Sequence, residues 1–217
     1  MTAADVQRLA KRGEGATLEF KLRTPESERL AKEVIAFANT NGGRLLIGVD
    51  DDGTVLGVKD SEEEEFALRY ALEKHCRPPV KWRTEHVGIS RKRDVIIVAV
   101  PRSNVRPHVL ISSNGHREST AYVRVGDRSI EASSEAMELM LEDKNQDVQF
   151  EFGKHELILL KYLDEYGRIG VDSFARLVDI SGDYARRILV LLTRAGILAH
   201  HLDYEGDYFT LSHNGLN

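Results

Sequence analysis

The chain has 217 residues, of which 41% are hydrophobic and 30% are charged, and its formal net charge is −5. This composition is that of an ordinary globular protein with room for one large or two small domains, and it excludes a disordered, collagen-like or disulfide-rich chain. The lone Cys76 excludes an internal disulfide and a cysteine-based zinc cluster. No apolar run approaches the ~20 residues that cross a bilayer and no signal-peptide pattern is present, so we expect a soluble, cytoplasmic protein with no membrane partner.

The first two thirds of the chain alternate between strand and helix patterns. Thr24 is predicted to cap a helix with Pro25 at its first position, and Asn41-Gly42-Gly43 to end it. The Asp50–Gly53 run predicts a tight turn, since Asp-Gly supplies the positive φ that such a turn requires. Strands are expected over 16–23, 44–49, 80–86, 94–100 and 121–125, and further helices over 61–76 and 134–142. The prediction is an α+β domain with a mixed sheet over residues 1–145.

The remainder of the chain, residues 150–217, has a different pattern. Three amphipathic helices are predicted, the second capped by Asp172 and separated from the third by a turn over 179–182. A hairpin follows, with its tip at 205–207 and its return strand at 208–211. Three helices, a tight second turn and a hairpin are the order of a winged helix-turn-helix domain.

Several short motifs of the first domain occur together in one order. They are residues 14–21 (EGATLEFK), 36–43 (AFANTNGG), 46–53 (LIGVDDDG), 100–103 (VPRS) with 106–108 (RPH), and 121–132 (AYVRVGDRSIEA). Together they closely resemble the nucleic-acid-binding module of the Schlafen family, which is also described as Alba-like. The resemblance implies a mixed-sheet Schlafen/Alba-like domain that binds nucleic acid, followed by a winged helix as in prokaryotic transcriptional regulators.

The resemblance also implies a candidate catalytic site. Some Schlafen proteins are metal-dependent endoribonucleases that use two glutamates five residues apart and an aspartate after a following strand, which here fall on Glu14, Glu19 and either Asp50 or Asp51. Glu14, Glu19 and Asp51 would hold Mg²⁺ or Mn²⁺, since carboxylates are hard oxygen ligands. Lys21 lies on the same strand face as Glu19 and would contact a scissile phosphate or simply pair with Glu19. Alternatively, the ion pair and the turn are structural, and no cofactor is required.

Basic residues concentrate between residues 80 and 128, where ten lysines and arginines oppose four carboxylates. Guanidinium groups bind phosphate oxygens bidentately, so these arginines are candidates for contact with nucleic acid. The residues selected are Arg102, Arg106, Arg124 and Arg128. The alternative is that they are scattered surface residues paired with nearby carboxylates.

In the predicted winged helix, the third helix would read DNA with its N-terminal residues. Tyr184, Arg186 and Arg187 are the candidates there, although acidic residues at the hairpin tip would repel a phosphate backbone. Our leading hypothesis is a DNA-binding transcriptional regulator. The alternatives are a divalent-metal-dependent endoribonuclease acting on structured RNA such as tRNA, and a protein-interaction adaptor. We expect a homodimer, because the family's ribonucleases combine two such modules and this chain has one.

Overall fold

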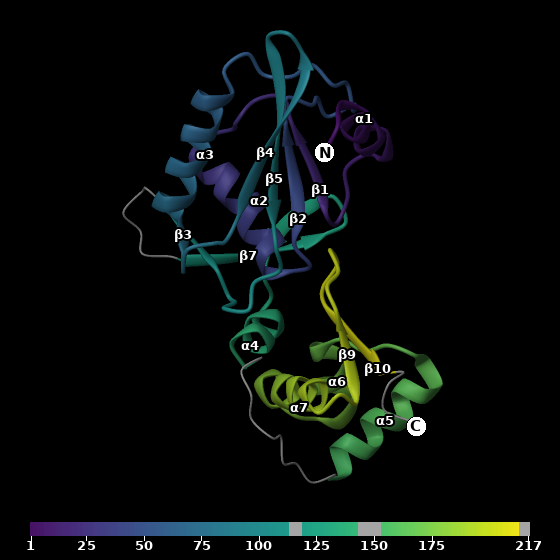
Figure 1. Ribbon diagram of the computed structural model, residues 1–217. Helices are drawn as coiled ribbons and strands as arrows, with labels where there is room; N and C mark the ends of the chain where they lie inside the picture. Colours follow the sequence, from purple (N-terminus) through teal and green to yellow (C-terminus); the bar gives the residue numbers. More distant parts are fainter. Residues whose placement is uncertain (113–118, 143–152, 213–217) are drawn as a thin grey trace. The chain divides into compact units, whose positions relative to one another are not determined.

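The computed structural model describes residues 1–112, 119–142 and 153–212, which divide into two compact units, Met1–Ala132 and Ser133–Asn217 (Figure 1). The predicted α+β class with a mixed sheet is confirmed. The first unit contains α1 (Ala3–Arg12), β1 (Leu18–Lys21), α2 (Ser27–Asn39), β2 (Gly43–Ile47), α3 (Ser61–His75), β3 (Cys76–Arg77), β4 (Arg83–Ser90), β5 (Arg93–Val100), β6 (Val109–Ile111), β7 (Ser119–Val125) and β8 (Arg128–Glu131). The second contains α4 (Ser134–Glu142), α5 (Lys154–Tyr166), α6 (Val171–Val178), α7 (Gly182–Arg194), β9 (Leu198–His201) and β10 (Tyr208–Leu211).

The first sheet of the first unit has the strand order β1-β2-β5-β4. β1 and β2 are parallel, with α2 as their connection, and the other neighbours are antiparallel. α2 and α3 cover one face of this sheet, where Leu30 and Ile35 are fully buried with Ile96. α1 covers the opposite face through Val6 and Ala10, as its position in Figure 1 shows. The sheet is therefore buried on both faces over most of its length, which leaves its ends for contact with other molecules.

The second sheet has the order β3-β6-β7-β8 and packs through β7 against α2. Asn39, at the end of α2, forms this joint with its side-chain amide. Its Nδ2 donates to the carbonyl oxygens of His108 and Tyr122 at 2.9 Å each, and its Oδ1 accepts from the backbone N–H of His108 at 2.8 Å. Asn39 is thus a structural residue of the 36–43 motif, since all of these bonds are made to buried backbone.

Two details of the first unit differ from the sequence prediction. α1 was not predicted, although Thr2 and Asp5 form a capping box at its start. Thr24 does not cap α2, which begins at Ser27; the Thr24 N–H instead donates to the Glu64 carboxylate of α3 at 2.7 Å. The Thr24 hydroxyl, which would accept a hydrogen bond in a cap, donates instead to the Glu64 carbonyl oxygen at 3.3 Å.

Cys76 is fully buried in the core beneath α3. Burial raises the pKa of its thiol to about 12, because the apolar surroundings disfavour the thiolate. We expect no reaction of the native protein with a thiol reagent such as DTNB at pH 8, and reaction of one thiol per chain in 6 M guanidinium. Rapid modification under native conditions would contradict this burial.

The second unit packs α5, α6 and α7 with the antiparallel β9–β10 hairpin around one core, which includes Leu159, Phe174, Leu189 and Phe209. The turn between α6 and α7 is tight. Asp179 adopts the left-handed conformation at φ 55°, and the Ser181 hydroxyl caps α7 by accepting from Tyr184 N–H.

Two sequence expectations for this part of the chain differ from the structure. Gly170, and not Asp172, is the N-cap of α6. α4, expected in the first domain, packs against α7 and belongs to the second unit. None of the helices in the described part of the chain has the length and apolar character needed to cross a bilayer.

Candidate nucleic-acid interface

Glu19 and Lys21 project from the same face of β1, as their spacing predicts, and they form an ion pair. Glu19 is buried, and its second oxygen accepts from Arg124 Nη2 at 2.5 Å. Lys21 Nζ also donates to the Phe20 carbonyl oxygen at 2.7 Å. Both oxygens of Glu19 are therefore engaged by cations, whose positive charges oppose the binding of a metal ion by this carboxylate.

Glu14 lies beside this pair and accepts a 2.7 Å hydrogen bond from the backbone N–H of Phe20. Burial raises the pKa of Glu14 above its ordinary 4.5; the Phe20 N–H opposes that shift, while the negative charges of Glu19 and Asp51 add to it. The carboxylates are thus near enough to repel one another.

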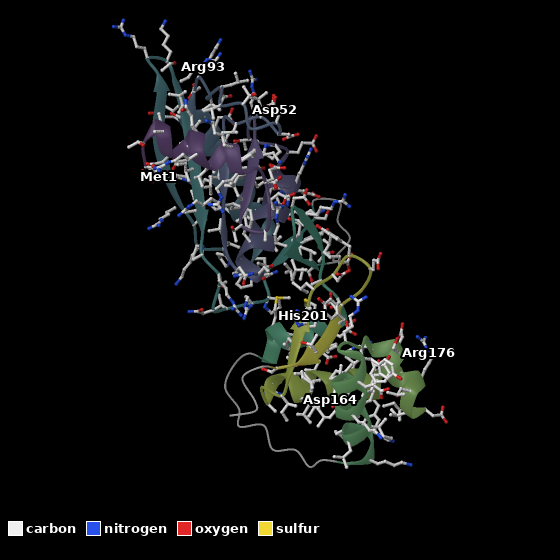
Figure 2. The ribbon with its side chains drawn as sticks, turned by 90° about the vertical axis from the view of Figure 1, so that its right-hand side faces the viewer. Met1, Asp52, Arg93, Asp164, Arg176 and His201 are labelled. Atoms are coloured by element: carbon white, nitrogen blue, oxygen red, sulfur yellow. The ribbon has the colours of Figure 1, made fainter. Side chains whose placement is uncertain are left out.

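The two aspartates belong to a turn. Asp50 accepts from Gly53 N–H through its carbonyl oxygen at 2.8 Å, and its side chain accepts from Asp51 N–H at 2.9 Å. Figure 2 shows Asp52 of this turn at the same end of the first unit as Arg93. Across the described ranges, no three His, Cys, Asp or Glu side chains are grouped so that they could hold a metal ion. The predicted ligand set of Glu14, Glu19 and Asp51 is therefore not assembled, and these residues do not fit Mg²⁺ or Mn²⁺ as arranged.

Replacing Glu14 by glutamine is expected to stabilise the first unit at pH 7. The amide oxygen still accepts from Phe20 N–H, while the buried charge and its repulsion by Glu19 and Asp51 are removed. The pKa of Glu14 is raised in the folded state, so ionised Glu14 destabilises the fold to its full extent at pH values above that pKa. This destabilisation disappears as the pH falls below 4.5. Urea unfolding should show a gain at pH 7 that vanishes near pH 4. The control is Glu165→Gln on the exposed surface of α5; an equal gain in both variants would contradict the assignment.

Arg124 is not available to a phosphate, which corrects the sequence prediction. Its side chain is 1% exposed, and besides Glu19 it bonds Glu33 Oε2 at 2.9 Å and the Gly15 carbonyl oxygen at 3.1 Å. Its guanidinium carbon lies 5.0 Å from the centre of the Phe37 ring. Arg124 therefore ties β7 to β1 and α2 as an internal clamp.

The other predicted arginines differ in their surroundings. Arg106 is half-buried and donates to the Asn39 carbonyl oxygen at 3.2 Å, so it binds the C-terminal end of α2, where a cation suits the helix dipole. Arg102 and Arg128 are exposed, on the loop after β5 and at the start of β8. Of the four arginines, Arg102 and Arg128 are the ones placed on the surface.

A solvent-open depression of about 610 Å³ lies at the end of the first sheet where β1, β2 and β4 begin and β5 ends. Its lining carries three cations, Arg44, Lys81 and Arg83, together with Trp82. There is no Asp or Glu among the described residues that line it. The three cationic side chains are exposed, so their charges are available to a ligand at this end of the sheet.

The strand register explains why two of these cations meet. Arg44 on β2 and Arg83 on β4 both lie directly opposite Ala99 of the intervening β5. Directly paired residues project from the same face of a sheet, so the short Ala99 side chain leaves an open space between two arginines. The signal available in the sequence was the carboxylate-poor run from residue 80 onward, whereas Arg44 lies outside it.

Gly42 and Gly43 give the depression its shape. Gly42 has φ +74°, and a Cβ there would meet Arg102 N and Val100 O at 2.7 Å; a Cβ on Gly43 would meet the Phe37 ring at 2.4 Å. The glycine pair thus ends α2, as predicted, and also lets the chain from Val100 to Arg102 pass closely. Exposed Arg102 follows directly on this rim.

Comparison with family models matches residues 14–133 to Schlafen, AlbA_2. The chain belongs to the Schlafen AlbA_2 family. The match contains the Glu19–Arg124 clamp, the Asn39 joint and every residue of the depression, so all three are features of the Schlafen AlbA_2 domain of this chain. No curated protein matches the sequence.

Two solved structures are similar to parts of the chain. The N-terminal domain of a RecG-related protein from Nitrosomonas europaea is 24% identical, with a TM-score of 0.45 over 59% of this chain and 91% of that one. The DIP2311 protein from Corynebacterium diphtheriae is 17% identical, with a TM-score of 0.45 over 91% of this chain. This chain spans about a third of the Corynebacterium protein, with 34% of it covered.

The predicted DNA-reading residues lie beyond the Schlafen AlbA_2 match, at the start of α7. Tyr184 and Arg187 are exposed. Arg186 is instead held by two carboxylates, Glu135 of α4 at 3.1 Å and Asp183 at 2.9 Å. The helix thus presents Arg187 on its surface, whereas Arg186 is tied to α4.

Proposed function

We propose that this chain binds nucleic acid through the basic depression of its Schlafen AlbA_2 domain, and that it acts as a DNA-binding transcriptional regulator. The observation that carries the proposal is the grouping of Arg44, Lys81 and Arg83 around one open depression without a lining carboxylate. In a chain with a net charge of −5, such a grouping is a local excess of positive charge that favours an anionic partner.

The chemistry of the depression suits phosphates. Arg44 and Arg83 each present a planar fork of N–H donors that matches two phosphate oxygens, and Lys81 adds a compact charge. Because these side chains are exposed, binding costs little desolvation and depends strongly on salt.

The second unit supports the finer proposal of DNA recognition. Its α6, tight turn, α7 and hairpin have the order of a winged helix-turn-helix, in which the N-terminal residues of α7 enter the major groove. One acidic residue of the hairpin tip is withdrawn from a DNA backbone, since Asp207 is buried and accepts hydrogen bonds from His200 and Ser133. Tyr184 and Arg187 remain exposed for contact.

The test is a salt series on the full chain. Fluorescence anisotropy would follow labelled duplex DNA, single-stranded DNA and tRNA between 50 and 200 mM NaCl. Three phosphate contacts predict that the logarithm of the association constant for duplex DNA falls with the logarithm of salt with a slope of about −2.7. Absence of binding to all three nucleic acids would overturn the proposal and favour an adaptor.

A parallel incubation of the same nucleic acids with Mn²⁺ or with EDTA distinguishes the regulator from a nuclease. We expect all three to be recovered intact in both conditions, since the carboxylates do not form a metal-binding group. Cleavage that requires Mn²⁺ and is lost in Glu14→Ala/Glu19→Ala would replace the regulator by an endoribonuclease.

A further inference from the structure

Trp82 adds an aromatic residue to the cationic lining of the depression. Trp82 is partly buried, packs against the core cluster formed by α2, α3 and the first sheet, and is also one of the residues that line the depression. Core contacts restrict the rotamers of the ring, so a ligand that packs on it meets a surface already in place. Lys81 and Arg83 are its chain neighbours, and both line the same depression.

A lining that combines an aromatic residue with cations matches a nucleotide unit and not a phosphate alone. Inorganic phosphate has no apolar face for the indole, whereas a nucleobase has one, and base–aromatic stacking is insensitive to sequence. A volume of about 610 Å³ lies within the range of small-molecule pockets and is ample for a nucleotide. Thr17 and Asn41, also in the lining, supply polar groups of the kind that contact base edges.

Within a duplex the faces of the bases are covered by their neighbours, so a duplex presents phosphates to this surface and hides the part that Trp82 would bind. An unpaired nucleotide offers both parts together. We propose that the depression binds unpaired nucleotides of a single-stranded nucleic acid, with the base against Trp82 and the phosphates on Arg44 and Arg83. This inference rests on the proposed nucleic-acid binding and specifies its ligand.

The sequence provides the probe, because Trp82 is the one tryptophan of the chain. Its fluorescence would be followed while the full chain is titrated with (dT)12, (rU)12, a 12-base-pair duplex and inorganic phosphate. We expect saturable quenching by both single strands, and little change with the duplex or with phosphate. The DNA and RNA arms show which sugar is preferred, and quenching by either supports the inference.

Variants separate stacking from charge, read by anisotropy of labelled (dT)12. Trp82→Ala is expected to weaken binding by about ten- to a hundredfold, and Trp82→Phe by less than about threefold, since the phenyl ring still stacks. Tyr70→Ala, which removes an exposed aromatic from α3 outside the depression, should leave the affinity unchanged. Circular dichroism of each variant checks the fold, and Trp82→Phe keeps the core filled if the alanine variant unfolds.

The outcomes distinguish this inference from the function on which it rests. If single strands and duplex bind equally and Trp82 fluorescence does not change, the nucleotide site is wrong while nucleic-acid binding stands. If quenching occurs but Trp82→Phe and Trp82→Ala lose affinity equally, stacking is not the cause and the inference falls. If no nucleic acid binds, the proposed function falls with it.

Discussion

Replacing Arg124 by alanine is expected to lower the free energy of unfolding of the first unit by about 3–5 kcal/mol, the usual effect of removing one partner from a buried ion pair. The variant leaves Glu33 without its cation and Glu19 with Lys21 alone. It also removes hydrogen bonds to the carbonyl oxygens of Gly15 and Leu18. These two carbonyl oxygens keep their backbone hydrogen bonds to each other's N–H groups, so the main loss comes from the two buried carboxylates.

The measurement is urea unfolding, read from the linear dependence of the free energy on denaturant. Arg91→Ala is the matched control, since it removes an exposed arginine of the first unit and surface changes usually lie within about 0.5 kcal/mol. Arg124→Lys should recover little, because a single ammonium cannot serve two carboxylates and a backbone carbonyl in this planar arrangement. A loss below about 1 kcal/mol in Arg124→Ala would show that the clamp does not hold the sheets together.

The clamp explains what two of the sequence motifs do for the fold. Glu19 and Arg124 come from motifs at opposite ends of the family domain, 105 residues apart, and each was assigned a separate role in contact with substrate or phosphate. Composition and spacing identify both residues as chemically notable. Composition and spacing cannot show that the two side chains form an ion pair with each other, because that depends on how β7 packs across α2.

Local patterns predicted the elements that local interactions control. The glycine pair after α2, the Asp-Gly turn and the turn over 179–182 before α7 are set by backbone preferences within a few residues. Of the second sheet, the sequence predicts only β7 and does not predict the strand order. The other strands, β3, β6 and β8, are short and gain their stability from pairing with distant strands. The sequence pattern does not predict α1, because the apolar face of this helix is narrow. Its buried residues, Val6 and Ala10, lie among polar and charged residues.

The depression was beyond prediction for a similar reason. Arg44, Lys81 and Arg83 each read as an ordinary surface residue at a strand end. Only the order β2-β5-β4 brings Arg44 and Arg83 to either side of Ala99, and sheet order was the part of the fold that the sequence left undetermined. The predicted arginines were chosen from the right region, yet the nearest of them to this site is Arg102 on its rim.

The double variant Arg44→Ala/Arg83→Ala is expected to abolish most of the nucleic-acid affinity at moderate salt. Each arginine contributes charge-assisted hydrogen bonds of about 1.5 kcal/mol or more, so the loss should be about tenfold for each. The salt slope on duplex DNA should also shrink by about 1.8, from about −2.7 to about −0.9, because two phosphate contacts are removed. The slope is the decisive reading, since a general loss of folding would reduce the bound fraction without changing it.

The matched control removes the same two charges elsewhere. Arg8 and Arg12 lie on the exposed side of α1, whose C-terminal part approaches Gly53 at the far end of β2 from Arg44. If binding depends on contact, Arg8→Ala/Arg12→Ala should keep both affinity and slope. If it depends on net charge alone, the two double variants should weaken binding equally. Equal weakening would remove the depression as the binding site, and with it the reason for placing a nucleotide against Trp82.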